Sequence, residues 1–299
     1  MTGLYNLTVR NSKLYFKDKG AFFSSLITPI ILLVLYATFL NKVYRESFLS
    51  ALPVGVKVAD KLIDGTVGAQ LFSSLLAVSC ITVSFCCNMV MVSDKASGVR
   101  SDFTISPVKN SVLSMSYYIA TFVSSLLVCS VAFLVSLVYL SQVGWFFTIK
   151  DIFLIFGDII LLVLFGTAIS SIINFFLSSQ GQITAVGTIV SAGYGFICGA
   201  YMPIYSFSDT LKRVFMLLPG TYGTSLIRNH SLRGVYEEME NVGFYSKDIE
   251  MIKDSIDCNL YIDGEKVKLS TMFLIVFLSV LILIGVYIIL NLCVKRKKK

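Results

Sequence analysis

Long apolar stretches separated by short polar ones dominate this chain. Six of them approach or exceed the length of a membrane-crossing helix: Ala21–Leu40, Thr66–Val92, Leu113–Leu140, Ile152–Phe176, Ile183–Tyr201 and Thr271–Val294. A hydrocarbon core about 30 Å thick needs roughly 20 apolar residues, because a helix rises about 1.5 Å per residue. The pattern therefore predicts an all-α polytopic membrane protein with six transmembrane helices.

Polar segments divide the chain into four parts. Residues 1–20 mix basic with apolar and aromatic side chains, which favours a helix lying on the membrane interface. Residues 21–202 hold the first five predicted spans and a charged segment at 93–110. Residues 203–270 leave the membrane, and residues 271–299 hold the last span and a basic tail.

The loops between the spans differ in character. Asn41–Gly65 is rich in charged residues and is predicted to be a short exposed loop. The segment 93–110 combines charges with Gly98 and Pro107, whereas Leu177–Gln182 carries no charge. We therefore predict that 93–110 is a contact surface at one face of the membrane rather than a simple linker.

Residues 203–270 are long enough to fold outside the membrane, as a small α+β extracellular insert before the last helix. Ser208 is a candidate N-cap for a helix. The apolar residues that follow it with the spacing of one helix face are Leu211, Val214, Phe215 and Leu218. Ser246 is predicted to cap a second helix, and Asp263-Gly264 favours a two-residue hairpin turn.

Composition and charge support this picture. The 299 residues are 56% hydrophobic and 14% charged, whereas about a quarter of a typical soluble domain is charged. The formal net charge of +7 is concentrated in short segments that would share one face, which predicts cytoplasmic termini in the plasma membrane. The tail 295–299 follows a span directly, so its expected partner is anionic membrane lipid and not nucleic acid.

The fifth predicted span carries small residues four positions apart: Gly187, Ser191, Gly195 and Gly199. Small side chains on one helix face let helix backbones approach closely in lipid. This face is predicted to pack against a neighbouring span of the same chain or to form a dimer seam, and the sequence does not separate the two.

Two polar residues inside predicted spans are candidates for a role in transport. Asp158 is the one acid well inside a span, where carboxylates often mark a pathway. It also lies only about one and a half turns after Ile152, so it is interpreted either as an interfacial anchor or as a substrate- or proton-binding group. Asn88, near the end of the second span, is the other candidate.

Motifs for catalysis or metal binding do not emerge from the sequence. No phosphate-binding G-x-x-x-x-G-K-[ST] loop occurs, so we predict a chain without its own ATPase site and without catalytic residues. The single histidine, His230, is predicted to lie in an outer loop, facing outside. It has no cysteine or acid cluster at ligand spacing, so no metal site is predicted.

Two segments resemble the permease subunits of type-2 ATP-binding cassette exporters. Asp94-Lys95-Ala96-Ser97-Gly98, followed by Phe103–Val108, resembles the family's acidic-basic, Ser-Gly and apolar-Ser-Pro pattern after the second span. Gly199, Pro203 and Pro219-Gly220-Thr221-Tyr222 with Arg228 resemble the family's outer signature after the fifth span. Ala96 stands where the family commonly has an acid. The resemblance covers Leu4 to Arg228 and the last span, and leaves Asn229–Leu269 as an insert.

This resemblance implies a role for each segment. Residues 93–110 would hold a coupling helix that docks on a separate ATP-binding cassette subunit, through Asp94, Lys95, Gly98, Arg100, Phe103, Ser106 and Pro107. Short re-entrant helices would form an outer gate with Tyr201, Pro203, Pro219, Tyr222 and Arg228. The family further implies a second permease chain, identical or a sister. ATP and Mg would bind to the partner subunits, with no cofactor on this chain.

The cargo predicted from the apolar span walls is an amphiphile: a drug, an antimicrobial peptide or a lipid-like molecule. The polar groups expected to line its path on the second span are Ser73, Ser74, Thr82, Ser84 and Asn88. Three alternatives stay open: polysaccharide export within the same family, an ATP-independent proton-coupled carrier, and a membrane scaffold or sensor. Against the carrier, no inverted repeat and no ionisable partner for Asp158 is evident.

Overall fold

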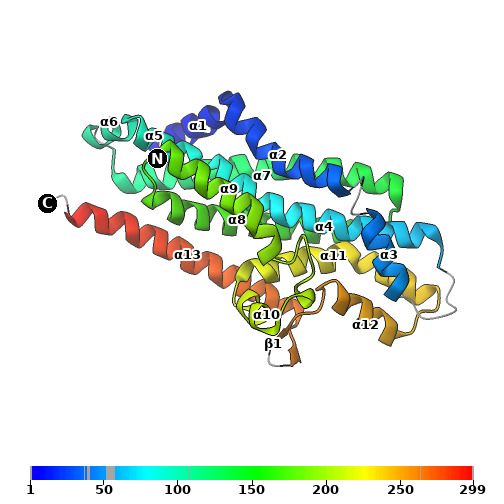
Figure 1. Cartoon of the computed structure of the whole chain (residues 1–299). Coiled ribbons are helices and arrows are strands. Elements are labelled where there is room, and N and C mark those ends of the chain that lie inside the picture. Colours follow the sequence, from blue (N-terminus) through cyan, green and yellow to red (C-terminus); the bar gives the residue numbers. More distant parts are fainter. Residues whose placement is uncertain are drawn as a thin grey trace.

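The computed structural model describes residues 2–36, 38, 41–51, 58–106, 108–262 and 264–297. Long helices run side by side along one axis of the molecule (Figure 1). Parts of the sequence predictions lie outside the described residues: Ala37, Phe39, Leu40, residues 52–57, Pro107, Asp263 and residues 298–299.

The N-terminal half contains α1 (Thr2–Lys17), α2 (Lys19–Leu35), α3 (Asn41–Ala51), α4 (Asp60–Cys87), α5 (Met89–Ala96), α6 (Val99–Ile105) and α7 (Asn110–Val143). The C-terminal half contains α8 (Ile149–Phe176), α9 (Gln180–Ile197), the 3-10 turn η2 (Ile204–Ser206), α10 (Asp209–Met216), α11 (Pro219–Asn241), α12 (Ser246–Ser255), β1 (Tyr261–Ile262), β2 (Glu265–Lys266) and α13 (Leu269–Lys297). The bundle has an α6 end, towards which both termini lie, and an α12 end with α3 and α12 (Figure 1).

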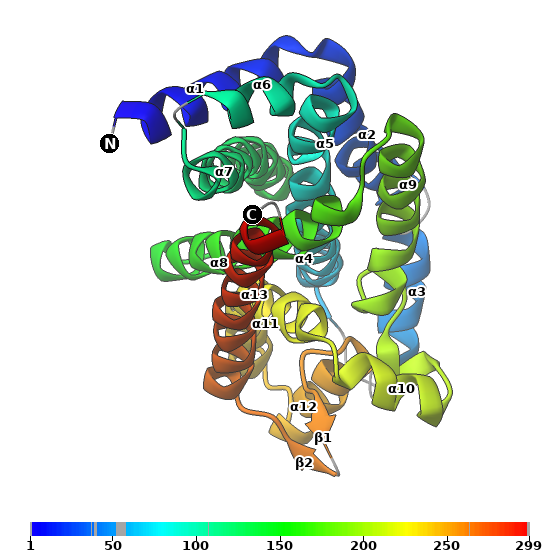
Figure 2. The ribbon, with the colours of Figure 1, turned by 90° about the vertical axis from the view of Figure 1, so that its left-hand side faces the viewer.

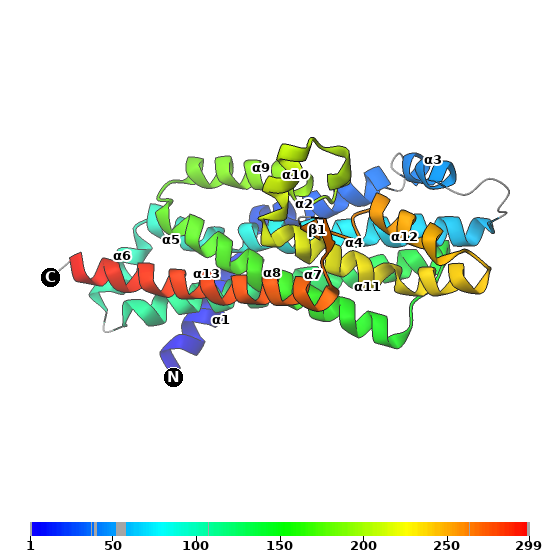
Figure 3. The same cartoon turned by 90° about the horizontal axis from the view of Figure 1, so that it is seen from below.

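Helix α4 occupies the centre of the bundle and contacts α2, α7, α8, α9 and α11 (Figure 2). In the most apolar stretch of the continuous span Asp60–Ala96, which comprises α4 and α5, 89% of the residues are buried. In the most apolar stretch of α13, only 17% of the residues are buried. A helix that is apolar on all sides is stable either in a protein core or in lipid. The sequence of α4 suits the first environment, and α13, which runs along α8 (Figure 3), suits the second.

Four helices of the described chain are long and apolar enough to cross a membrane: Asp60–Ala96, Asn110–Val143, Ile149–Phe176 and Leu269–Cys293. Helices α1 and α2 pass the same test together, bent by 73°. Helix α9 is not in this set, because glutamine, glycine, threonine and serine lower its hydropathy. The described residues thus form a nearly all-α, multi-pass membrane protein with four or five membrane-capable helices, and the count of six stays a prediction.

The predicted exposed loop at Asn41–Gly65 is wrong over much of its length. Helix α3 begins at Asn41, and α4 already begins at Asp60. Arg45 pairs with the carboxylates of Asp60 and Asp64, which ties α3 to the first turns of α4. The charges that suggested a solvated loop therefore connect two helices.

The predicted insert is also corrected, because its first part belongs to the bundle. Helix α11 runs without a break through Asn229 to Asn241 and packs along α4. Its buried apolar residues have helical spacing: Leu232, Val235, Tyr236 and Met239. Helix α12 begins at Ser246 with Tyr245 at the N-cap, and the predicted hairpin consists of β1 and β2 with two residues each.

Candidate functional site

The predicted coupling segment forms two short helices at the α6 end. Helix α5 follows α4 at Asn88, and Gly98 then turns the chain into α6. Gly98 has a φ of 82°, a left-handed conformation that glycine adopts at little cost. This backbone requirement gives a physical reason for glycine at the junction between α5 and α6.

Asp94 is directed into the protein. Its side chain is 8% exposed and pairs with Arg10, with 3.1 Å between Nη2 and Oδ1. The Tyr117 hydroxyl donates a hydrogen bond of 2.5 Å to the same carboxylate. The Arg10 guanidinium also lies 5.0 Å from the centre of the Phe103 ring. Helices α1, α5, α6 and α7 are thus held together at one point.

Lys95 connects the same segment to α8. Its ammonium donates to the carbonyl oxygens of Asn174, Phe175 and Leu177 at 2.8, 2.7 and 3.0 Å. The last carbonyls of a helix have no partner within the helix and carry a partial negative charge, so a lysine there is stabilising. Both charges of the Asp94-Lys95 pair are therefore engaged within the chain.

Asn88 joins three helices inside the bundle. Its amide donates to the hydroxyls of Ser170 and Ser171 at 3.0 and 3.1 Å, and its oxygen accepts from Thr121 at 3.3 Å. The other polar residues predicted to line a cargo path are also buried: Ser73, Ser74, Thr82 and Ser84. They lie between helices of the same subunit, so a cargo path along them stays a prediction.

The outward side of the segment carries an apolar residue that sequence reasoning passed over. Ile105, at the end of α6, is 85% exposed. Arg100 is half-buried, and the Ser106 hydroxyl donates to the carbonyl of Phe103 at 2.7 Å. The available signal was its position directly before Ser106-Pro107, in the apolar-Ser-Pro pattern.

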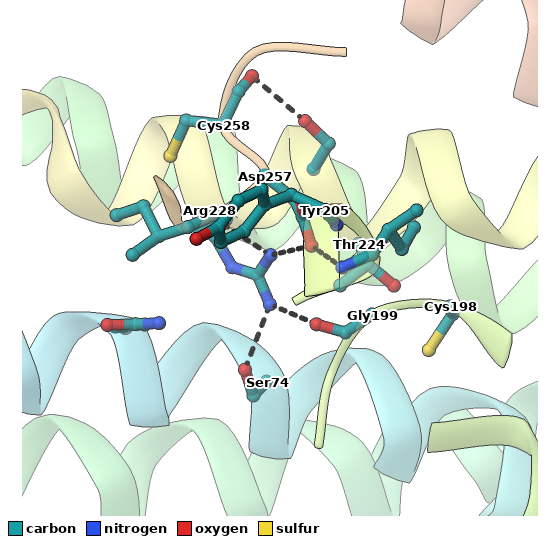
Figure 4. A network of polar contacts seen from close by, with 12 residues as sticks. Ser74, Cys198, Gly199, Tyr205, Thr224, Arg228, Asp257 and Cys258 are labelled. Atoms are coloured by element: carbon teal, nitrogen blue, oxygen red, sulfur yellow. Dashed lines mark hydrogen bonds and ion pairs between the residues drawn. The ribbon is translucent and has the colours of Figure 1, made fainter. Parts of the chain in front are cut away.

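Arg228 lies at the centre of a second polar cluster, shown in Figure 4, and its side chain is 2% exposed. Its guanidinium donates to the carbonyls of Ile256 and Gly199 at 2.7 and 2.8 Å, and to the Ser74 hydroxyl at 3.2 Å. The Asp257 carboxylate lies 3.7 Å away. One arginine thus connects α11 with α4, the end of α9 and the segment after α12. Ser74 and Asp257 were not predicted as partners.

The remaining predicted gate residues lie near the ends of α9, α10 and α11. The Tyr201 carbonyl accepts from the Tyr44 hydroxyl at 3.3 Å. Pro203 precedes η2, and Pro219 is the first residue of α11, a position where its missing N–H costs no helix hydrogen bond. The Tyr222 hydroxyl donates to the carbonyl of Met216 at 2.6 Å, which fixes the end of α10 against α11.

The small residues of α9 have two different environments. Gly187 and Ser191 line an open groove of about 1020 Å³ between α2, α4 and α9. Gly195 lies against the Tyr201 ring, where an added Cβ would be 2.3 Å from a ring carbon. Gly199 ends the helix region with a φ of 73°. The first pair therefore lines the groove, with the Met89 side chain 3.2 Å from a Cβ added at Gly187, and the second pair serves packing within the chain.

Asp158 has an ionisable partner, which corrects two predictions. His230 does not face outside: it lies on α11, with its Nδ1 2.5 Å from a carboxylate oxygen of Asp158 on α8. Two turns earlier on α8, the buried Asp151 pairs with Arg233. Hydropathy placed His230 in a loop, because the polar sequence of α11 hid a helix that packs along α8.

The described residues contain no group of three histidine, cysteine or acidic side chains placed to hold a metal ion. They form a multi-pass helical bundle with the α5–α6 turn at one end and the buried polar cluster around Arg228 towards the other. These are features of a membrane transport subunit.

The comparisons with known proteins define the family. The sequence model described as "ABC-2 family transporter protein" matches residues 50–292, so the chain belongs to this family. The match includes residues 229–269, which corrects the predicted gap in the resemblance. This family is generally the membrane component of ATP-binding cassette transporters, and membership implies an ATP-binding cassette partner. No curated protein matches the chain.

Proposed function

We propose that this chain is the permease subunit of an exporter that moves an amphiphile out of a bacterial cell, with ATP and Mg bound and hydrolysed on separate subunits. The α6 end then faces the cytoplasm together with both termini. Helices α2 and α9 complete six spans in the plasma membrane. Membership of the ABC-2 family and the four strongly apolar helices support this assignment.

The observation that carries the proposal is the exposure of Ile105 at the C-terminal end of α6. An apolar side chain that is 85% exposed beyond the spans is suited to a hydrophobic groove on a partner. Asp94, Lys95 and Gly98 hold the turn from inside, while Ile105 and Arg100 are the residues that would meet the ATP-binding subunit.

The contacts of the turn define a route for movement. Closure of the partner around ATP would push on α6. Lys95 would pass this movement to the end of α8, and Asp94 would pass it to α1 and α7. Because α4 continues from α5 to the Ser74–Arg228 contact, the same push would reach the predicted outer gate.

The groove between α2, α4 and α9 is the basis for our proposals on the class of cargo and on the dimer interface. Its volume of about 1020 Å³ suits a drug-sized amphiphile. We propose that a second permease chain, identical or a sister, covers this groove and that Gly187 and Ser191 lie at the seam. Apolar walls with a few hydroxyls favour an amphiphile over a polysaccharide.

The test is co-purification with the ATP-binding subunit, together with ATP-dependent uptake of a fluorescent amphiphile by inside-out vesicles. Ile105→Asp should release the subunit and abolish uptake while the chain stays folded in the membrane. Ile149→Asp is the matched control, since Ile149 is 75% exposed at the first position of α8, the helix end opposite to the one that Lys95 contacts. Equal capture of the subunit by both variants would contradict the docking assignment.

A further inference from the structure

A second cavity lies on the flank of the bundle, away from the turn and from the groove along α9. Its volume is about 720 Å³, and it is bounded by η2, α10, α12 and β1. Figure 2 shows α10 beside α12 and the hairpin. Three of its lining side chains are large, apolar and exposed: Tyr205 at 63%, Leu217 at 80% and Met251 at 58%. An exposed apolar cavity of this size is typical of a binding site.

The walls of this cavity carry opposite charges that no other described residue neutralises. Arg213 on α10 forms no ion pair with any described residue. Asp254 on α12 accepts hydrogen bonds from the Asn259 amide at 2.7 Å and the Tyr261 hydroxyl at 2.8 Å, but no described cation pairs with it. Both side chains line the cavity without pairing with each other. A ligand that bears both signs of charge would satisfy both walls.

The floor of the cavity is connected to the Arg228 cluster. Asp257 lines the cavity and accepts hydrogen bonds from the backbone N–H of Ile204 at 2.6 Å and of Tyr205 at 3.4 Å. The same carboxylate faces Arg228, which holds the end of α9 and Ser74 of α4. A molecule in the cavity thus touches the elements that the predicted outer gate is made of.

We propose that this cavity binds a zwitterionic amphiphile, with its anionic group at Arg213, its cationic group at Asp254 and its apolar body over Met251 and Leu217. A purely anionic amphiphile would meet the carboxylate of Asp254, and a purely cationic one would meet Arg213 and Lys212. The inference rests on the proposed function in taking this ligand as the exported class of molecule. Binding itself requires no ATP-binding subunit.

The experiment uses the full chain in phosphatidylglycerol nanodiscs and three photo-crosslinking probes. The probes share one diazirine-bearing alkyl chain and differ in the head group: phosphocholine, sulfate or trimethylammonium. Labelled peptides are mapped by mass spectrometry. We expect the phosphocholine probe to label peptides of α10 and α12 about threefold to tenfold more than the other two, as for one or two partly exposed charge contacts. Equal labelling by all three, or none in these peptides, would overturn the proposal.

Charge variants sharpen the test. Arg213→Glu and Asp254→Lys should each reduce phosphocholine labelling to the level of the singly charged probes. Lys247→Glu, an exposed charge on α12 outside the cavity, should leave it unchanged. Asp254 also accepts hydrogen bonds from Asn259 and Tyr261, so its replacement could disturb the local fold. Asp254→Asn removes the charge but keeps a hydrogen-bond acceptor, and thermal melting of each variant shows whether reduced labelling comes from lost binding or from unfolding. Undiminished labelling of folded Arg213→Glu would contradict the proposal.

The occupant's source is distinguished by adding phosphatidylcholine to the nanodiscs. Competition supports the site with a bilayer lipid as occupant, and undiminished labelling supports it with a free amphiphile. The outcome can be separated from that of the proposed function. Absence of cavity labelling together with normal capture of the ATP-binding subunit rejects only the proposed ligand site. Normal labelling together with failed capture rejects only the coupling assignment.

Discussion

Arg10 and Asp94 are 84 positions apart in the sequence and form an ion pair at the α6 end of the bundle. The pair connects the amphipathic N-terminal helix to the turn that we assign to the ATP-binding partner. Tyr117 completes the coordination of the carboxylate from α7. Residues 1–20 are therefore more than an interfacial anchor, because α1 restrains the position of α5.

Removing one member of this pair should impair coupling. Arg10→Ala leaves the 8% exposed Asp94 carboxylate with Tyr117 as its one side-chain partner among the described residues, and we expect a loss of stability of about 1–3 kcal/mol. ATP turnover should continue while amphiphile uptake falls. Thermal melting and a double-mutant cycle with Asp94→Ala measure the pair, and Arg10→Lys serves as the conservative control. Fully additive single effects would show that the two residues do not act together.

Gly98 provides a second test of the turn. A side chain at a φ of 82° costs about 1 kcal/mol, so Gly98→Ala should tilt α6 relative to α5 and uncouple ATP turnover from uptake. Phe103→Ala should act in the same direction, since it removes the ring beneath Arg10. Gly157→Ala is the control: it lies inside α8 with open space around its position, and should be neutral or stabilising. Normal uptake by both Gly98→Ala and Phe103→Ala would contradict the coupling assignment.

The sequence predicts the elements of this fold better than their partners. Apolar length identified the four strongest membrane helices, and turn chemistry identified the hairpin at 261–266, because both signals are local. The predicted start of the insert at Asn229 lies inside α11, because the polar residues of this helix resemble those of a solvated loop. The helical spacing of Leu232, Val235, Tyr236 and Met239 was already present in the sequence. Burial beside α4 and α8 outweighed that polarity.

The candidate site shows the same division. Glycine is the residue type that readily adopts the left-handed conformation found at position 98. The residue type alone therefore marks this position in the sequence. The partners of Asp158, Arg228 and Asp94 are separated from them by dozens of positions, and no local pattern specifies them. The inward direction of Asp94 and Lys95 depends on the positions of Arg10 on α1 and of the end of α8. Only the packed bundle determines these positions, and with them the outward direction of Ile105.

The hairpin region should lose stability in acid. Burial acts to raise the pKa of Glu250, but hydrogen bonds from Lys266, Lys253 and Asn259 outweigh it and lower this pKa to about 2. A depressed folded-state pKa stabilises the fold above the unfolded value, near pH 4.5, and this contribution is lost as the pH falls towards 2. Since Glu250 is 44% exposed, we expect about 1 kcal/mol or less.

Limited proteolysis of residues 256–268 over that pH range measures this effect. At neutral pH, Glu250→Gln should be cleaved as readily as the natural chain is in acid. The cleavage of this variant should also change less as the pH is lowered. Glu240→Gln, at an exposed position near the end of α11, should behave like the natural chain. Identical acid profiles for all three proteins would show that Glu250 does not stabilise the hairpin.

Two carboxylate contacts between α8 and α11 allow a matched test of the role of Asp158. Asp158 contacts His230, and Asp151, two turns earlier, pairs with Arg233, which stays charged. We expect Asp158→Asn and Asp151→Asn each to lower stability by about 1–3 kcal/mol. Thermal melting of both variants at about pH 6 and about pH 8 measures these losses. If Asp158→Asn also leaves ATP-driven uptake unchanged across this range, Asp158 is a structural clamp, and the proton-coupled carrier is rejected. An uptake rate that becomes independent of pH in this variant alone would instead assign a proton-binding role to the pair.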